Sequence, residues 1–168
     1  DEPGLIRPSE PGKWGTFPKD KEIFPDPTGG QVTGLWAANA GLLVFTSRST
    51  FLITQSDDGQ DFKSATITAS VGCVAPNTIK TQKSGLTIWL GEDAFYAFDG
   101  VKVEKISDAL DADIKRMTDS RRRQAAAAVD LRTGEYRCWM SLDGSRENNT
   151  CFIFDGIGWR RRNDVYAF

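Results

Sequence analysis

Two runs of three arginines are the strongest candidates for chemistry in this sequence. They comprise Arg121, Arg122 and Arg123, and then Arg160, Arg161 and Arg162. Such clusters could contact the phosphates of DNA, with an affinity that falls steeply as salt rises. In a strand, alternate side chains point to opposite faces, so at most two arginines of each run would share a surface. Salt bridges between subunits, or a solvated sheet edge that discourages aggregation, are therefore the favoured interpretation, and DNA contact is the alternative.

Acidic residues offer two further candidates. The segment Asp57–Asp61 clusters carboxylates around a glycine, as a calcium ion requires, but it lacks the alternating spacing and the closing glutamate of an EF-hand. We interpret it as a solvated turn. Asp99 and Asp155 each follow an apolar stretch and precede a glycine, where a carboxylate can accept hydrogen bonds from nearby backbone N–H groups. We expect these two to form turns and not to act as paired catalytic carboxylates.

The composition removes several classes of enzyme. The chain contains no histidine, which excludes Ser-His-Asp and Cys-His catalysis and histidine-ligated zinc. Its cysteines, Cys73, Cys138 and Cys151, match no metal-ligand spacing and are expected to be reduced and buried. A Cys138–Cys151 disulfide across a hairpin is the less favoured alternative. We therefore predict a protein that is not an enzyme and that binds neither a cofactor nor a metal.

Length and charge are those of a globular protein. The 168 residues suffice for one domain with a substantial core, and 5 Trp, 10 Phe and 16 Gly are typical of short strands joined by tight turns. The formal net charge of -2 argues against a generic nucleic-acid binder. No apolar run approaches the roughly 20 residues that cross a bilayer, so we expect no membrane span. Because the chain begins at Asp1, we expect it to be a piece of a longer protein.

A repeat organises the elements that must position these residues. The sequence GLLVFTSRSTF of Gly41–Phe51 returns as GLTIWLGEDAF of Gly85–Phe95. The alignment matches Val44 with Ile88. It also matches other apolar residues of the first copy with apolar residues of the second. Repeats of this length indicate β-propeller blades, because one unit cannot bury its apolar face without a neighbour.

A third, partial copy closes the chain. Phe152–Ile157 matches Tyr96–Val101, and Trp139 matches Trp89. The spacing between these two matches is longer in the third copy. A longer hairpin loop at Leu142–Asn149 accounts for the difference, since surface loops tolerate insertions.

These patterns predict an all-β, mainly antiparallel fold of propeller-like blades with about four strands each, and an incomplete propeller. Residues 1–31 contain most of the prolines and are expected to form an extended connecting segment. Residues 32–168 are expected to form the propeller-like domain. Its three blade-like units are predicted at 32–70, 71–118 and 119–168.

Three local features complete the prediction. In the connecting segment, apolar side chains are expected to hold it against a neighbouring surface: Trp14, Phe17, Ile23 and Phe24. One short helix is predicted near 108–118, with Ser107 and Asp108 at its start and three apolar residues on one face: Leu110, Ile114 and Met117. The segment Gln124–Val129 is predicted to be a strand paired with residues 135–140.

The order of these motifs resembles the β-propeller region of tailed-bacteriophage structural proteins, of the tail tube, nozzle or head-to-tail stabilisation type. The resemblance is carried by PSEPG at Pro8–Gly12, GLLVFT at Gly41–Thr46, GCVAPN at Gly72–Asn77 and FDGV at Phe98–Val101. DLRTGEYR at Asp130–Arg137 is similar to the start of the blade that follows in that family. These are turn and core motifs, which discriminate less well than a catalytic signature.

The resemblance implies a non-enzymatic component of the virion, in the tail nozzle or tube or in the neck, assembled in the host cytoplasm. Such proteins form subunit interfaces around the DNA exit path, commonly as six-fold rings with other tail and neck proteins. Transient contact with phage DNA would fall to the two arginine runs. Three blades are fewer than the roughly four to eight that close a propeller, so a complete protein would carry more. The alternative is a propeller binding module whose loops at 56–61 and 142–149 recognise a host-surface glycan or receptor.

Overall fold

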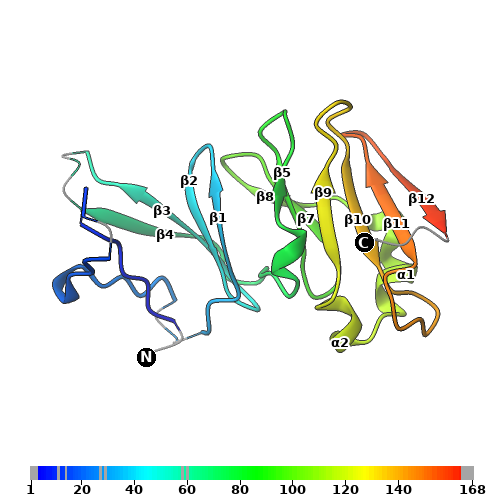
Figure 1. Cartoon of the computed structure of the whole chain (residues 1–168), viewed down its shortest axis with the longest axis horizontal. Coiled ribbons are helices and arrows are strands. Elements are labelled where there is room, and N and C mark those ends of the chain that lie inside the picture. The colour runs from blue at the N-terminus through cyan, green and yellow to red at the C-terminus, as the bar shows by residue number, and fades with distance from the viewer. Residues whose placement is uncertain are drawn as a thin grey trace. The chain divides into compact units, whose positions relative to one another are not determined.

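The computed structural model describes residues 4–10, 12–13, 15–26, 28, 30–57, 59 and 61–163. Within them it contains three antiparallel sheets of four strands each (Figure 1). This architecture confirms the predicted all-β, mainly antiparallel fold of blades with about four strands. The chain divides into two compact units, residues 1–72 and 73–168, and each is described by itself. No described helix is long and apolar enough to cross a membrane.

The first unit contains a sheet in which consecutive strands are neighbours. Its strands are β1 (Gly34–Ala38), β2 (Gly41–Phe45), β3 (Thr50–Gln55) and β4 (Phe62–Thr68). Gly41, the first residue of the repeat, has a φ of +143°, and a Cβ atom there would lie 2.5 Å from the backbone oxygen of Ile53. The repeat begins with glycine because β3 approaches the backbone so closely.

The amino-terminal segment packs against one face of this sheet. Val44 and Phe51 lie opposite each other on β2 and β3 and form a buried cluster with Ile53. Ile6 and Ile23 form an isolated antiparallel bridge and pack against that cluster. The segment is therefore part of the first unit, where apolar contacts hold it to the sheet.

The other predicted anchors of this segment behave differently. Phe17 and Phe24 are about half exposed, so the expectation that they hold the segment to a surface is wrong within this chain. Trp14 lies outside the described residues. A single turn of 3-10 helix, η1 (Lys19–Lys21), is the only helical element that the structure describes here.

The second unit contains two sheets, with strand orders β5-β6-β7-β8 and β12-β11-β10-β9. The turn η2 (Pro76–Thr78) precedes the first of them. The strands are β5 (Lys80–Thr81), β6 (Thr87–Leu90), β7 (Phe95–Phe98), β8 (Val103–Lys105), β9 (Ala126–Val129), β10 (Tyr136–Met140), β11 (Thr150–Phe154) and β12 (Trp159–Asn163). The pairing of β9 with β10 confirms the strand predicted at Gln124–Val129.

Aromatic side chains join these two sheets into one core. Phe95 of β7 lies with its ring centroid 6.1 Å from that of Tyr136 and 4.6 Å from that of Trp159. The ring of Phe154 lies 5.1 Å from Trp159. The Tyr136 hydroxyl donates a hydrogen bond of 2.8 Å to the backbone oxygen of Thr78, so its one polar atom is satisfied inside the core.

Strand register tests the alignment of the repeat. Val44 faces the same side of its sheet as Phe51, and Ile88 faces the same side as Phe95. The first two copies therefore have equivalent faces. In the third copy the match of Trp139 to Trp89 is wrong. Trp89 shares a face with Phe98, whereas Trp139 lies on the opposite face from Phe154, because the equivalent strands are offset by one residue.

The predicted helix is shorter than expected and is followed by a second one. The structure has η3 (Asp108–Leu110), α1 (Asp111–Lys115) and α2 (Asp119–Arg122). The predicted apolar face is confirmed, since Leu110, Ile114 and Met117 are all buried. Ser107 does not cap the helix. Its hydroxyl instead accepts a hydrogen bond of 2.8 Å from the backbone N–H of Phe95.

Each predicted blade-like unit contains one sheet. Strands β1–β4 lie within 32–70, β5–β8 within 71–118, and β9–β12 within 119–168. The division of the chain after Gly72 groups the amino-terminal segment with the first sheet. The sequence placed that segment outside the domain because its prolines obscure the apolar contacts of Ile6 and Ile23.

Candidate functional site

The first arginine run lies on a helix and its end, so the alternation that a strand would give does not apply to it. Arg121 and Arg122 belong to α2, and Arg123 follows the last helical residue. Arg121 donates hydrogen bonds of 2.7 Å to the backbone oxygen of Arg146 and of 3.0 Å to the side chain of Gln124. Helical spacing thus gives the three arginines three different environments.

Arg122 is a buried structural residue. Its guanidinium pairs with the Asp119 carboxylate at 3.1 Å. It also lies 3.5 Å and 3.4 Å from the backbone oxygens of Ile114 and Met117, to which it donates. These carbonyl groups lie in the last turn of α1 and just beyond it, and the Ile114 oxygen also accepts a hydrogen bond from the backbone N–H of Met117. Arg122 therefore joins α2 to α1 and is not available to a ligand.

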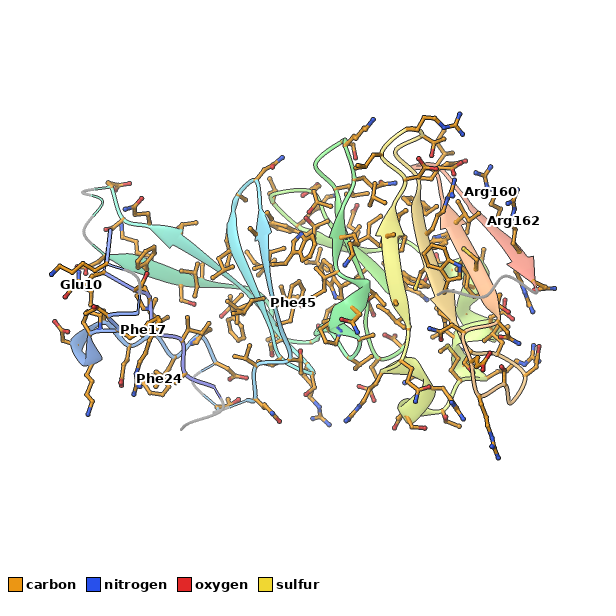
Figure 2. All side chains as sticks on the ribbon, viewed as in Figure 1. Glu10, Phe17, Phe24, Phe45, Arg160 and Arg162 are labelled. Carbon is orange, nitrogen blue, oxygen red and sulfur yellow. The ribbon has the colours of Figure 1, made fainter. Side chains whose placement is uncertain are left out.

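The second run lies on β12, the edge strand of the third sheet, as Figure 2 shows for Arg160 and Arg162. Arg160 forms an ion pair with Glu135. Arg161 projects to the other face and pairs with Asp113 of α1 at 3.0 Å. The predicted alternation of side chains along a strand is confirmed for this run.

Four of the six arginines are therefore engaged within the second unit. Among the described residues, the guanidinium groups of Arg123 and Arg162 have neither a hydrogen bond nor an ion pair. The phosphate backbone of DNA could therefore contact two unpaired guanidinium groups instead of six. A sheet edge protected by charge accounts for β12 more fully than a nucleic-acid site does.

The repeated aspartates form turns, as predicted. Asp99 accepts hydrogen bonds of 2.8 and 2.9 Å from the backbone N–H groups of Val101 and Lys102. Asp155 does the same with Ile157 and Gly158, at 2.9 Å each. Asp130 accepts two equivalent bonds in the β9–β10 turn. Their carboxylates are occupied by the backbone and are not aimed at a common point.

These hydrogen bonds lower the pKa values of the turn carboxyls. Backbone N–H donors hold the pKa values of Asp99, Asp130 and Asp155 below the ordinary range. Hydrogen bonds from Arg137 and Arg160 lower the pKa of Glu135. Each group therefore favours the folded state while it is ionised.

We expect the free energy of unfolding to fall as the pH drops below about 4. The reason is that these carboxyls take up protons in the unfolded chain at a higher pH than in the folded chain. Urea titrations at a series of pH values would measure the effect. The double substitution Asp99→Asn and Asp155→Asn should reduce the slope of stability against pH, while a slope unchanged by it would contradict the assignment.

The acidic segment of the first unit forms surface ion pairs. Asp57 lies 3.8 Å from Lys63, and Asp61 lies 3.3 Å from Lys21. Asp58 and Gln60, also in the segment weighed for calcium, lie outside the described residues. Within the part of the chain that is described, no group of three or more Cys, Asp or Glu side chains is placed to hold a metal ion.

The cysteines are free and buried, as predicted. Cys138 lies opposite Phe152 and Cys151 opposite Trp139, so the two cysteines occupy opposite faces of the third sheet. A disulfide between them is not formed. Burial raises the pKa of Cys73 to about 12, so its nucleophilic thiolate is scarce at neutral pH.

We expect all three thiols to resist a thiol reagent such as 5,5′-dithiobis(2-nitrobenzoic acid) in the native protein. They should react fully once a denaturant unfolds the chain, because only unfolding exposes them. Spectrophotometric counting of the released chromophore checks this. Rapid reaction of one thiol under native conditions would show that at least one of these sites opens locally.

One concavity of the first unit lies beside the amino-terminal segment. It is a groove of about 570 Å³ whose lining is mostly apolar. Ile6 and Ile23 form one side, and Leu35 and Phe62, about half exposed, form another. The side chains of Val44, Phe51 and Ile53 are themselves buried.

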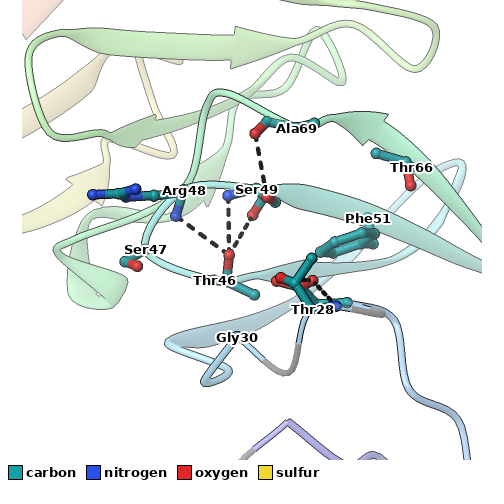
Figure 3. Close-up of a pocket in the computed structure, with 10 residues that line it drawn as sticks. Thr28, Gly30, Thr46, Ser47, Arg48, Ser49, Phe51, Thr66 and Ala69 are labelled. Carbon is teal, nitrogen blue, oxygen red and sulfur yellow. Dashed lines mark hydrogen bonds between the residues drawn. The ribbon is translucent and has the colours of Figure 1, made fainter.

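A smaller hollow of about 350 Å³ lies near the β2–β3 turn (Figure 3). Its hydroxyl and carboxylate groups serve the local backbone. The Thr46 hydroxyl accepts hydrogen bonds from the N–H groups of Arg48 and Ser49, and Asp26 accepts one of 2.8 Å from Thr28. The hollow therefore presents no acid and base held in position for catalysis.

Exposed apolar residues are the features that sequence reasoning missed. Val101, Leu131 and Ile157 are 83%, 78% and 97% exposed, and each sits in a turn held by an aspartate. Val101 lies before β8, which begins at Val103. The recurring Asp-Gly-apolar sequence at Asp99 and Asp155 was the available signal, because Asp-Gly predicts a turn and a turn residue does not face a core.

No protein-family model matches the chain, and no curated protein is significantly similar to it. The resemblance to phage propeller proteins depends on the order of turn and core motifs in the sequence. Those motifs specify how sheets are built, and a shared fold does not by itself define a function.

Proposed function

We propose that this chain is a non-catalytic structural component of a tailed-bacteriophage virion, located in the tail or the neck, and that it acts through subunit interfaces. One observation carries the proposal. The side chains that could act as acids, bases or ligands already make hydrogen bonds or ion pairs within the chain, whereas apolar side chains remain exposed. A protein built in this way offers surfaces for assembly.

The occupied groups are those that a catalytic site would need. The carboxylates of Asp99, Asp130 and Asp155 accept backbone hydrogen bonds. Arg122 and Arg161 pair with acidic side chains of the same unit. Reactive groups that are hydrogen-bonded or paired in this way stabilise turns and helix ends, and few of them remain free to bind a substrate.

The exposed groups suit protein contacts. In the first unit Phe17, Phe24, Leu35 and Phe62 are between 43% and 54% exposed. Aromatic and aliphatic side chains of this kind dominate the buried centres of protein interfaces. The proposed partners are other copies of the chain in a ring and other tail or neck proteins. DNA contact is a secondary proposal that involves Arg123 and Arg162.

Recognition of a host-surface glycan or receptor is less well supported. The loop at 142–149 closes on itself, because the Leu142 N–H donates a 3.0 Å hydrogen bond to the Asn149 side chain and the Ser141 hydroxyl donates to the Ser145 backbone. It contains no aromatic side chain to stack on a sugar. The loop at 56–61 also lacks one.

Electron microscopy tests the proposal. Gold-labelled antibodies against the purified chain should decorate one fixed position on the tail or neck of particles from the phage that encodes it. The same antibodies, after adsorption with the purified chain, provide the control. Absence of label on intact and on disrupted particles would contradict the proposal.

A further inference from the structure

The last strand of each sheet in chain order is here called its outer strand. The outer strand of the first sheet, β4, differs from the outer strands of the other two sheets, β8 and β12. β4 is an edge strand (Figure 1) and, at seven residues, the longest described strand. Its only charged residue is Lys63. β8 has three residues, of which Glu104 and Lys105 are charged, and β12 carries three arginines. Short or charged edge strands resist pairing with other chains, so β8 and β12 are protected and β4 is not.

The outer side of β4 is accessible. Phe62–Thr66 are exposed, and their pairing with β3 is regular. The one irregularity in that pairing lies beyond them, between Thr50 and Phe51 of β3. In the portion of the chain that the structure describes, the backbone of Phe62–Thr66 hydrogen-bonds to no segment other than β3. Half of its N–H and C=O groups therefore point away from the sheet, toward any strand that approaches.

The sequence of β4 is compatible with its own copy. An antiparallel pair with a twofold axis at Ser64 places Lys63 opposite Ala65 of the second copy. It also places Phe62 opposite Thr66, and aromatic with β-branched residues is a stabilising cross-strand combination. No like charges are opposed in this register.

The other two outer strands are not compatible with their copies. A twofold axis at the centre of β12 would place Arg161 opposite itself and Arg160 opposite Arg162. The same operation on β8 would place Glu104 opposite itself. Like charges directly opposite each other destabilise a strand pair. Electrostatics therefore selects β4 among the three outer strands.

We infer that β4 is a self-association edge, which pairs antiparallel with β4 of a second copy of this chain about a twofold axis at Ser64. The two first sheets then form one continuous sheet across the axis. Because the interface is isologous, it closes as a dimer and does not propagate. The inference goes beyond the proposed virion role, since it concerns the isolated chain and is tested without particles.

Cysteine cross-linking tests the register. In the variant Ser64→Cys the two new thiols lie directly opposite each other, with Cα atoms about 4.5–5.5 Å apart, which suits a disulfide. In the matched control Thr66→Cys, on the same face of the same strand, the thiols are about 14 Å apart. Under mild oxidation Ser64→Cys should form a covalent dimer and Thr66→Cys should not. The buried native cysteines make the unmodified chain the blank.

A matched charge pair tests the interface without oxidation. Ala65→Glu places carboxylates opposite Lys63 twice and should tighten the dimer roughly tenfold, whereas Ala65→Lys should weaken it by a similar factor. Sedimentation equilibrium gives both dissociation constants, and circular dichroism confirms that both variants are folded. A monomeric chain at all concentrations, equal association of the two variants, or equal cross-linking of Ser64→Cys and Thr66→Cys would overturn the inference.

Discussion

Replacement of Phe95 by alanine is expected to lower the free energy of unfolding by about 3–5 kcal/mol. Phe95 is fully buried and its ring contacts those of Tyr136 and Trp159, so the substitution leaves a cavity between the second and third sheets. Urea denaturation followed by tryptophan fluorescence measures the change, because Trp159 lies beside the cavity.

The matched control is Phe17→Ala, which makes the same chemical change at an exposed phenyl ring. It should alter stability by no more than about 0.5 kcal/mol. Similar losses for the two variants would mean that the shared core of the second and third sheets does not stabilise the fold as described.

Replacement of Arg122 by alanine is expected to cost about 2–3 kcal/mol. The substitution removes a donor from the backbone oxygens of Ile114 and Met117. Ile114 keeps its hydrogen bond from the backbone N–H of Met117, whereas the Met117 oxygen loses the donor that Arg122 supplies. Thermal and urea unfolding of the variant against the unmodified chain measure the loss. Helical content by circular dichroism should fall slightly, since α1 and α2 lose their connection.

Its neighbour in the same run provides the control. Arg123 is exposed, and Arg123→Ala should leave stability within about 0.5 kcal/mol of the unmodified chain. If the two variants lost equal stability, or if Arg122→Ala lost none, the structural role of Arg122 would be refuted.

Local periodicity was sufficient to predict the sheets. Alternating apolar residues and turn glycines located the strands. The first two copies of the repeat have equivalent faces, because Val44 lies on the same face as Phe51 and Ile88 on the same face as Phe95. Gly41 was correctly recognised as a repeat position. Glycine is required at position 41 because the backbone of Ile53 lies so close. That closeness is a tertiary contact, which no local sequence pattern contains.

The third copy shows where pattern matching fails. Trp139 and Trp89 are identical residues that each precede an apolar-Phe-Asp-Gly segment, yet they face opposite sides of their sheets. A loop of altered length separates the matched pieces, and an uncertainty of one residue in that loop reverses the face of a side chain. Register cannot be fixed by residue identity alone.

The roles of the arginine runs could be predicted only in part. The alternation at Arg160 and Arg161 follows from the strand itself. The helix that contains Arg122 was not predicted, because its four residues are too few to give a periodic signal. The partners of Arg122 at Ile114 and Met117 become neighbours only when α1 and α2 fold against each other, and the acidic partners of β12 come from distant segments.

The most direct test of a structural virion role is the number of copies of this chain in each purified particle. Isotope-labelled reference peptides, quantified by mass spectrometry against the major capsid protein, give that number. We predict a small, fixed copy number that survives a high-salt wash and is constant between preparations, as expected of a ring. Absence from the particles, or a content that varies between preparations and falls with washing, would contradict the proposed role.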